Sequence, residues 1–207
     1  MYQEALTNTG KKIFPYLKKF KPYYLAGGTA IAIQLGHRIS VDFDFFSDKK
    51  IPKTLYSHVK KILPESTSLR PAVNNSDELT IFANDTKITF LYYPFPLVKP
   101  LINLCGLQLP IIQELAAMKA YTIGRRGEFK DYIDLYYVLL NKHASLKEIL
   151  TIARKKYKND FNDRLFLEQL LYLDDVNLTG IRLLKQDHPT KKGLKEFFQV
   201  QIKKLAL

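Results

Sequence analysis

The stretch from residue 23 to residue 48 limits the possible folds most, because it places two acids inside an apolar run. It reads YYLAGGTAIAIQLGHRISVDFDFFSD, and the acids are Asp42 and Asp44. Alternation of side-chain character over 40–46 predicts a β-strand. Successive side chains of a strand point to opposite faces, so both acids would share one face and Val41 would lie on the buried face. Two neighbouring carboxylates repel each other, so a positive partner is expected between them.

The glycine pair before this predicted strand suits a turn between a strand and a helix. Residues 23–26 are β-prone, and residues 29–36 predict a short helix that ends at a glycine. Gly27 and Gly28 would let the backbone approach a ligand closely. Thr29 would add a hydroxyl donor, and the unpaired N–H groups of the first helical turn would favour an anion. The pattern predicts a phosphate site beside the acidic face of the strand.

A divalent cation would make the two acids tolerable. Mg²⁺ prefers oxygen ligands and typically uses one or two carboxylates together with substrate phosphates. Asp42 and Asp44 are therefore the predicted ligands of Mg²⁺ or Mn²⁺, and a triphosphate held at the glycines would lie near these carboxylates. The alternative is a pair of solvated acids on an edge strand.

Composition indicates a folded, basic chain. Its 207 residues are 46% hydrophobic and 25% charged, which suffices for a normal core and argues against disorder. The single cysteine, Cys105, excludes an intramolecular disulfide, argues against structural zinc, and is expected in the core. Without a long apolar window or an apolar signal segment, we expect a cytoplasmic protein with no membrane partner. The formal charge of +12 favours a polyanionic partner, nucleic acid above all.

The rest of the chain predicts an α+β fold, with strands in the first half and helices in the second. We expect residues 1–105 to form one domain and residues 106–207 a helical domain that completes the active-site cleft. The predicted elements are a helix over 1–20, a helix over 53–63, a hairpin over 78–94 with its turn at Asn84 and Asp85, and helices over 110–124, 128–142, 161–173 and 191–206, with a further helix opened by a Ser145–Glu148 capping box.

These residues resemble the AbiEii/AbiGii toxin family of type IV toxin–antitoxin systems. GGTAIAIQLGHRISVDFDFF is similar to the nucleotidyltransferase signature of that family, and ELAAMKAYTIGRRGEFKDYIDLYYVL is similar to its later helices. The resemblance covers about residues 22–140. It implies a polymerase-β-like nucleotidyltransferase core, a mixed sheet with flanking helices, followed by a helical C-terminal half. It also implies Mg²⁺-dependent transfer of a nucleoside monophosphate from a nucleoside triphosphate (NTP) to an acceptor.

The resemblance also implies roles for residues outside the acid pair. Lys119 would hold a phosphate as a point charge. Asp131 would either accept a proton from the acceptor hydroxyl or position Lys119. Arg38 and Ser40 would contact the nucleotide, although Arg38 would also suit the negative end of the preceding helix. Further candidate site residues are Asp134, Arg125 and Lys130.

One departure from the family pattern concerns a third carboxylate. Polymerase-β-like enzymes usually add it from a later strand, but the corresponding run TKITFLYY offers Thr86, Lys87 and Thr89 and no acid. Either the site has two carboxylates or another residue supplies the base. The acids that flank the predicted hairpin are Asp77, Glu78 and Asp85.

Three functions fit these observations. The first is a nucleotidyltransferase toxin that modifies RNA, at the 3′ end of tRNA, with a cognate antitoxin encoded nearby that counters it without stable binding. The second is nucleotidyl transfer to a small molecule or a protein. The third is a non-catalytic nucleotide- or RNA-binding module, motivated by the missing third carboxylate.

Overall fold

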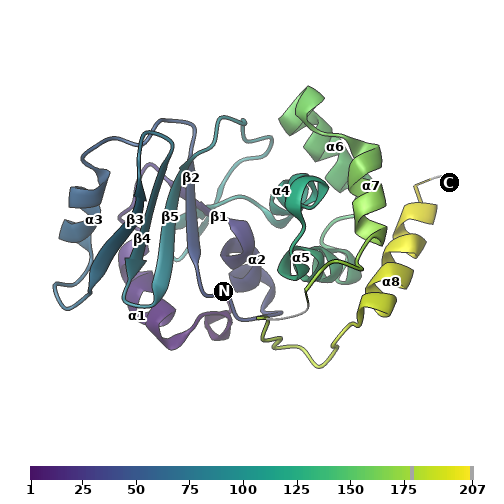
Figure 1. Cartoon of the computed structure of the whole chain (residues 1–207), viewed down its shortest axis with the longest axis horizontal. Coiled ribbons are helices and arrows are strands. Elements are labelled where there is room, and N and C mark those ends of the chain that lie inside the picture. The colour runs from purple at the N-terminus through teal and green to yellow at the C-terminus, as the bar shows by residue number, and fades with distance from the viewer. Residues whose placement is uncertain (178–179, 206–207) are drawn as a thin grey trace.

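The computed structural model describes residues 1–177 and 180–205, and it has an α+β fold (Figure 1). Its main sheet is mixed, because β2 and β5 are parallel while the other neighbouring pairs are antiparallel. In spatial order, the strands are β1 (Tyr24–Ala26), β2 (Phe43–Ser47), β5 (Thr86–Tyr92), β4 (Glu78–Ala83) and β3 (Leu69–Asn74).

Helices flank this sheet and then form the second half of the chain. The first three are α1 (Asn8–Leu17), α2 (Gly27–Leu35) and α3 (Leu55–Ile62). The later ones are α4 (Ile112–Arg126), α5 (Phe129–Leu140), α6 (Leu146–Tyr157), α7 (Asp163–Leu171) and α8 (Lys191–Lys203). None of the described helices is long and apolar enough to cross a membrane. Figure 1 shows α2 between the sheet and helices α4 and α5.

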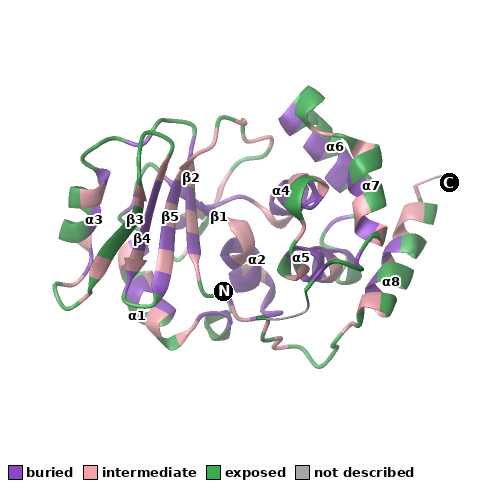
Figure 2. Cartoon of the chain, viewed as in Figure 1, coloured by how far each residue is buried: buried purple, intermediate pink, exposed green. Residues whose placement is uncertain are grey.

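One face of the sheet is an aromatic core, and this burial orients the acidic face. Phe43 and Phe45 of β2 are buried, and the Phe45 ring stacks on Phe90 with ring centroids 5.3 Å apart. Phe20, just after α1, packs edge-on against Phe45 and Phe90. Buried and half-buried residues alternate along β2 (Figure 2). Because side chains alternate along a strand, Asp44 lies on the face opposite Phe43 and Phe45.

Helix α2 is apolar all round because it is covered on both sides. Ile31, Ile33 and Leu35 are all buried, and α2 packs against β1 and β2 as well as α4 and α5. The predicted C-cap is confirmed: Gly36 has φ +63°, and its N–H donates to the carbonyl of Ala32. The helix is thus a fixed support on which both halves of the chain are assembled.

Several predicted element boundaries were wrong, and the helix predicted over 29–36 already begins at Gly27. The strand predicted over 40–46 begins at Phe43, so Val41 is 56% exposed and not buried. The preceding segment is held by other partners, since the N–H of Ser40 donates to the carbonyl of Ala5. The helix predicted over 1–20 is interrupted, because Thr7 accepts a hydrogen bond from Gly10 and so caps α1.

Cys105 was predicted to be a core thiol and is instead exposed. It lies in the turn of a small hairpin that the sequence did not reveal, between β6 (Ile102–Leu104) and β7 (Leu107–Leu109). Cys105 and Gly106 both have positive φ, as a two-residue hairpin turn requires. The turn therefore points the thiol toward solvent.

Other local signals were confirmed. Asn84 has φ +51° at the turn between β4 and β5. Ser145 and Glu148 form the predicted capping box at the start of α6. The predicted division of the chain near residue 105 stays a prediction; one hydrophobic cluster includes buried residues from both sides of it.

A buried ion pair holds the proline-rich connection between the two halves. The Glu114 carboxylate on α4 accepts the N–H of Val98 and of Lys99, at 3.0 and 2.8 Å. The Lys156 ammonium on α6 lies 2.9 Å from Glu114 and donates to the carbonyl of Pro96. Every partner of this buried carboxylate is therefore a donor.

Candidate active site

A cavity of about 390 Å³ opens between the acidic face of the sheet and helices α4 and α5. Its walls come from both halves of the chain. The predicted site residues that line it are Gly27, Gly28, Asp42, Asp44, Lys119, Arg125, Lys130 and Asp131. Residues separated by about a hundred positions in the sequence thus line the same cavity.

The acid pair lies on the sheet side of this cavity. Asp44 is on β2, and Asp42 immediately precedes the strand. Burial raises the pKa of Asp44; the Asp42 charge adds to this, and the Lys87 charge opposes it. Two carboxylates beside the glycine pair are a donor set that fits Mg²⁺, which completes its octahedron with phosphate oxygens and water.

Glycine is required at both positions of the turn. Gly27 has φ +63°, and a Cβ atom there would lie 2.6 Å from Oδ2 of Asp44. A Cβ atom on Gly28 would lie 2.2 Å from Nη2 of Arg38. The acid and the guanidinium therefore both pack directly on the backbone of the turn.

Replacing Gly27 with Ala is expected to destabilise the chain by about 1–2 kcal/mol, because an L residue is disfavoured at this φ. The added methyl would also displace the Asp44 carboxylate. Urea unfolding measures the effect. The matched control is Gly124→Ala in α4, where the nearest atoms to an added Cβ lie 4.0 Å away and the change should stabilise the helix by about 0.5–1 kcal/mol. Equal effects of both substitutions would contradict the strain at Gly27.

Thr29 and Ser40, predicted to bind nucleotide, are buried behind the acid pair. Their hydroxyl oxygens lie 2.7 Å apart in a shared hydrogen bond, and the Thr29 hydroxyl also donates to the carbonyl of Asp42. Neither residue is among those that line the cavity. In this geometry they fix the backbone of Asp42, and direct nucleotide contact stays a prediction.

Asp134 is the centre of a buried ionic network beneath the glycine turn. Its side chain is fully buried and accepts hydrogen bonds from Arg38 Nε at 2.6 Å and Nη2 at 3.0 Å. His37 Nε2 lies 2.7 Å from the same carboxylate, and Lys119 Nζ lies 2.8 Å from it. The Arg38 guanidinium, predicted to contact phosphate, is thus directed at Asp134 and does not line the cavity.

The network keeps Asp134 and Lys119 charged. Burial alone would raise the pKa of Asp134, but Arg38, Lys119 and the hydrogen bond from His37 hold it well below its usual value. Burial alone would lower the pKa of Lys119, but Asp134 and Asp131 raise it above its usual value. Burial lowers the pKa of His37 despite Asp134. Lys119 therefore enters the cavity wall as a cation.

Both carboxylate oxygens of Asp131 have partners. Oδ1 lies 2.6 Å from Lys119 Nζ, and Oδ2 accepts the N–H of Glu128 at 3.0 Å in the capping box of α5. Of the two roles considered for Asp131, this arrangement favours positioning of Lys119 over acceptance of a proton.

The two other predicted site cations that line the cavity, Lys130 and Arg125, also have partners. Lys130 Nζ lies 2.8 Å from Glu128. The Arg125 guanidinium lies 4.3 Å from the centre of the Tyr121 ring, which is stacked on Tyr157. Tyr121 was not among the predicted site residues; the signal available was its position four residues before Arg125 on α4, which puts both on one side of the helix.

No third carboxylate joins the acid pair from the neighbouring strands. The three acids that flank the hairpin, Asp77, Glu78 and Asp85, are not among the residues that line the cavity. Instead, Lys87 Nζ on β5 lies 3.2 Å from Oδ2 of Asp42. The sequence showed the missing acid but not this contact.

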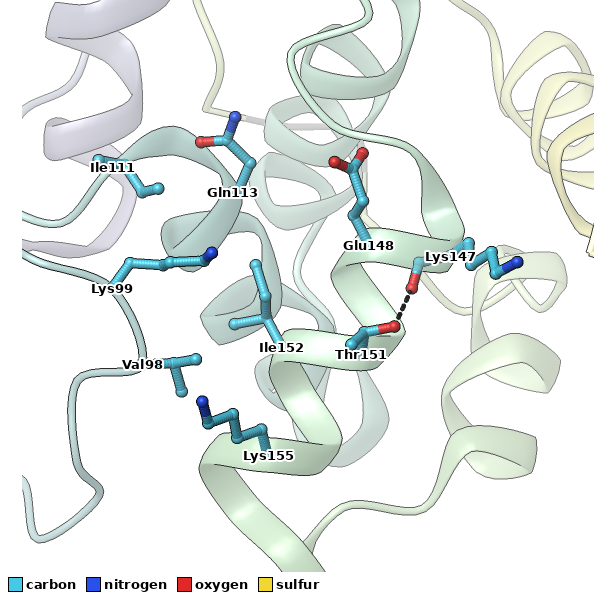
Figure 3. A pocket seen from close by; sticks show the side chains of 9 residues that line it. All are labelled: Val98, Lys99, Ile111, Gln113, Lys147, Glu148, Thr151, Ile152 and Lys155. Atoms are coloured by element: carbon cyan, nitrogen blue, oxygen red, sulfur yellow. Dashed lines mark hydrogen bonds between the residues drawn. The ribbon is translucent and has the colours of Figure 1, made fainter.

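A second cavity, of about 490 Å³, lies between α6 and the segment that includes Val98 (Figure 3). Lys99 and Lys155 extend into it from different walls. Glu148, the one acid among its described lining residues, is bound to the start of α6 as a cap. Although it is larger, this cavity lacks an acid pair and a glycine turn, so the chemistry is assigned to the first.

Comparison with known proteins gives a consistent result. Residues 13–98 match the family described as nucleotidyl transferase AbiEii toxin, type IV TA system. An uncharacterized protein of Aquifex aeolicus (strain VF5) is 32% identical over 185 residues, which is 87% of this chain and 86% of that protein.

Two solved structures share the fold. MenT4, a nucleotidyltransferase toxin of Mycobacterium tuberculosis H37Rv, has a TM-score of 0.66 at 15% identity, over 94% of this chain and 82% of that one. JHP933 of Helicobacter pylori has a TM-score of 0.59 at 21% identity, over 97% and 95% of the two chains. The polymerase-β-like nucleotidyltransferase fold expected from the sequence is confirmed.

Proposed function

Because this chain belongs to the AbiEii family of nucleotidyltransferase toxins of type IV toxin–antitoxin systems, we propose that it transfers a nucleoside monophosphate from an NTP to the 3′ end of a tRNA. One observation carries the proposal: the glycine turn, the acid pair and Lys119 all line a single cavity. The acceptor hydroxyl oxygen would bond to the α-phosphorus while the bond from that phosphorus to the bridging oxygen breaks. Pyrophosphate leaves, and the hydroxyl proton passes to water.

The residues of the cavity suit these roles. Asp42 and Asp44 would hold Mg²⁺ or Mn²⁺, which when bound stabilises the charge on the phosphates. The backbone of Gly27 and Gly28, at the start of α2, would receive the triphosphate. Lys119 would neutralise a phosphate oxygen, with its ammonium oriented by Asp131.

The charge of the chain supports an RNA acceptor. Five basic residues line the cavity: Lys87, Lys119, Arg125, Arg126 and Lys130. The whole chain carries a formal charge of +12. The basic cavity and the positive net charge would both strengthen the binding of a polyanionic acceptor. They would not strengthen the binding of a neutral small molecule or an uncharged protein segment.

Incubation of the purified chain with Mg²⁺, each α-labelled NTP and total tRNA tests the proposal. We expect label on tRNA, no transfer in EDTA, and no transfer to tRNA whose 3′ end has been oxidised with periodate. Label on protein or on a small molecule would favour the second function considered above. NTP binding with no transfer, unchanged by Asp42→Ala, would favour the non-catalytic module.

Membership of a type IV system implies a cognate antitoxin. We propose that it counters the effect of the toxin without forming a stable complex with this chain. Restored growth without co-purification of the two proteins is the corresponding observation.

A further inference from the structure

We propose that Lys87 occupies the place of the third carboxylate, so that this cavity takes one divalent cation and uses the Lys87 ammonium as its second positive charge. This inference rests on the proposed function, because it concerns the same cavity. Two-metal sites hold ions about 3.5–4 Å apart to stabilise both the attacking and the leaving oxygen. A site with fewer oxygen ligands must obtain that second charge from its own side chains.

The register of the sheet places Lys87 beside the acid pair. Strands β2 and β5 are parallel neighbours, and Asp44 is paired with Thr89. Lys87 and Thr89 alternate with the buried Ile88, so both lie on the face that carries Asp44. Lys87 is therefore on the strand, and on the face, from which a later carboxylate would reach the same cavity.

Its contact with the acid pair is direct. Lys87 Nζ lies 3.2 Å from Asp42 Oδ2, with the two side chains 38% and 29% exposed. The other candidate on this face, Thr89, accepts a hydrogen bond from the Thr80 hydroxyl and carries no charge. The Lys87 ammonium is thus the charged group of β5 that contacts the acid pair, through Asp42.

The other lysines of the cavity are engaged elsewhere. Lys119 lies 2.6 Å from Asp131, and Lys130 lies 2.8 Å from Glu128. Lys87 differs from both because its ion-pair partner is one of the predicted metal ligands.

The oxygen ligands are also too few for two ions. Among residues 1–177 and 180–205, no group of three or more His, Cys, Asp or Glu side chains is arranged to hold a metal ion. Two carboxylates with phosphate oxygens and water satisfy one octahedral cation. A second dication would lie beside an ammonium that already contacts Asp42, and like charges at that separation repel strongly.

The test counts Mn²⁺ ions bound per full-length chain by electron paramagnetic resonance, with an NTP analogue that cannot be cleaved between its α- and β-phosphates. We expect one ion in the wild type and two spin-coupled ions in Lys87→Glu, which restores a third carboxylate. Lys87→Met should keep one ion and bind it roughly tenfold more tightly, since a competing charge is removed, yet transfer nucleotide more slowly.

The matched control is Lys53→Glu, the same charge change at an exposed lysine, which should leave the count at one. Two ions in the wild type, or one ion in a folded Lys87→Glu, would overturn the inference while label transfer to tRNA left the proposed function standing. No ion in the wild type would overturn both. If Lys87→Glu does not fold, Lys87→Met tests the inference: tighter Mn²⁺ binding with slower transfer supports it, and unchanged binding overturns it.

Discussion

Replacing Asp44 with Asn is expected to lower the rate of nucleotidyl transfer by about 10³-fold or more, equivalent to about 4 kcal/mol of transition-state stabilisation. The amide keeps the shape of the side chain on β2 but removes the charge that a divalent cation requires. The labelled-NTP assay measures the loss, and Asp42→Asn should act in the same direction. Asp85→Asn is the control, because that exposed acid lies in the β4–β5 turn, away from the cavity.

The same substitution should not weaken the metal-free fold. Burial, with a contribution from Asp42 that Lys87 opposes, raises the pKa of Asp44 above its usual value. The ionised carboxylate therefore reduces folding stability at neutral pH, and Asn removes that cost. We expect the unfolding temperature of Asp44→Asn to equal or exceed that of the wild type. A steep fall would mean that Asp44 is a structural residue.

Asp134→Ala is expected to lower the free energy of unfolding by about 3–5 kcal/mol. The substitution leaves the buried Arg38 guanidinium and the Lys119 ammonium without the carboxylate that binds both. Urea unfolding measures the loss. Glu168→Ala, which breaks an exposed pair with Arg164, is the control and should cost no more than about 1 kcal/mol. A loss at Asp134 no larger than this would contradict the importance of the network.

The pH dependence of folding stability shows whether Asp134 stabilises the chain through its charge or through its packing. The folded-state pKa of Asp134 lies well below the usual 3.8, so its stabilisation is complete above that value and is lost as the pH falls through the folded-state pKa. The stability difference between wild type and Asp134→Asn should therefore be constant near neutral pH and shrink below about pH 4. A difference that persists unchanged in acid would indicate lost packing instead of lost charge.

Much of the fold was predictable because its signals are local. Gly36 and Asn84 mark positions with positive φ, and the Ser145 cap needs only residues three positions apart. Strand β3 was missed because Pro71 interrupts an exposed edge strand that has no clear alternation. Cys105 was wrongly predicted to be buried because that prediction used only the usual burial of cysteines. The two-residue hairpin turn in which it lies exposes the thiol instead.

The site was less predictable because its electrostatics are non-local. The acid pair and the glycines lie within one short stretch and could be recognised from spacing alone. Two of the partners of Asp134, Arg38 and His37, are 96 and 97 positions away, and periodicity does not show which cation a buried acid will bind. The contact of Lys87 with Asp42 likewise depends on the pairing of β2 with β5.

The pairing of Arg38 and Lys119 with one carboxylate has a consequence for folding during synthesis. A ribosome finishes the strand that carries Asp44 long before it reaches α5, and until α5 emerges Lys119 lacks both of its carboxylate partners, Asp131 and Asp134. The network, and with it the cavity wall that includes Lys119, can therefore form only after α5 has been synthesised.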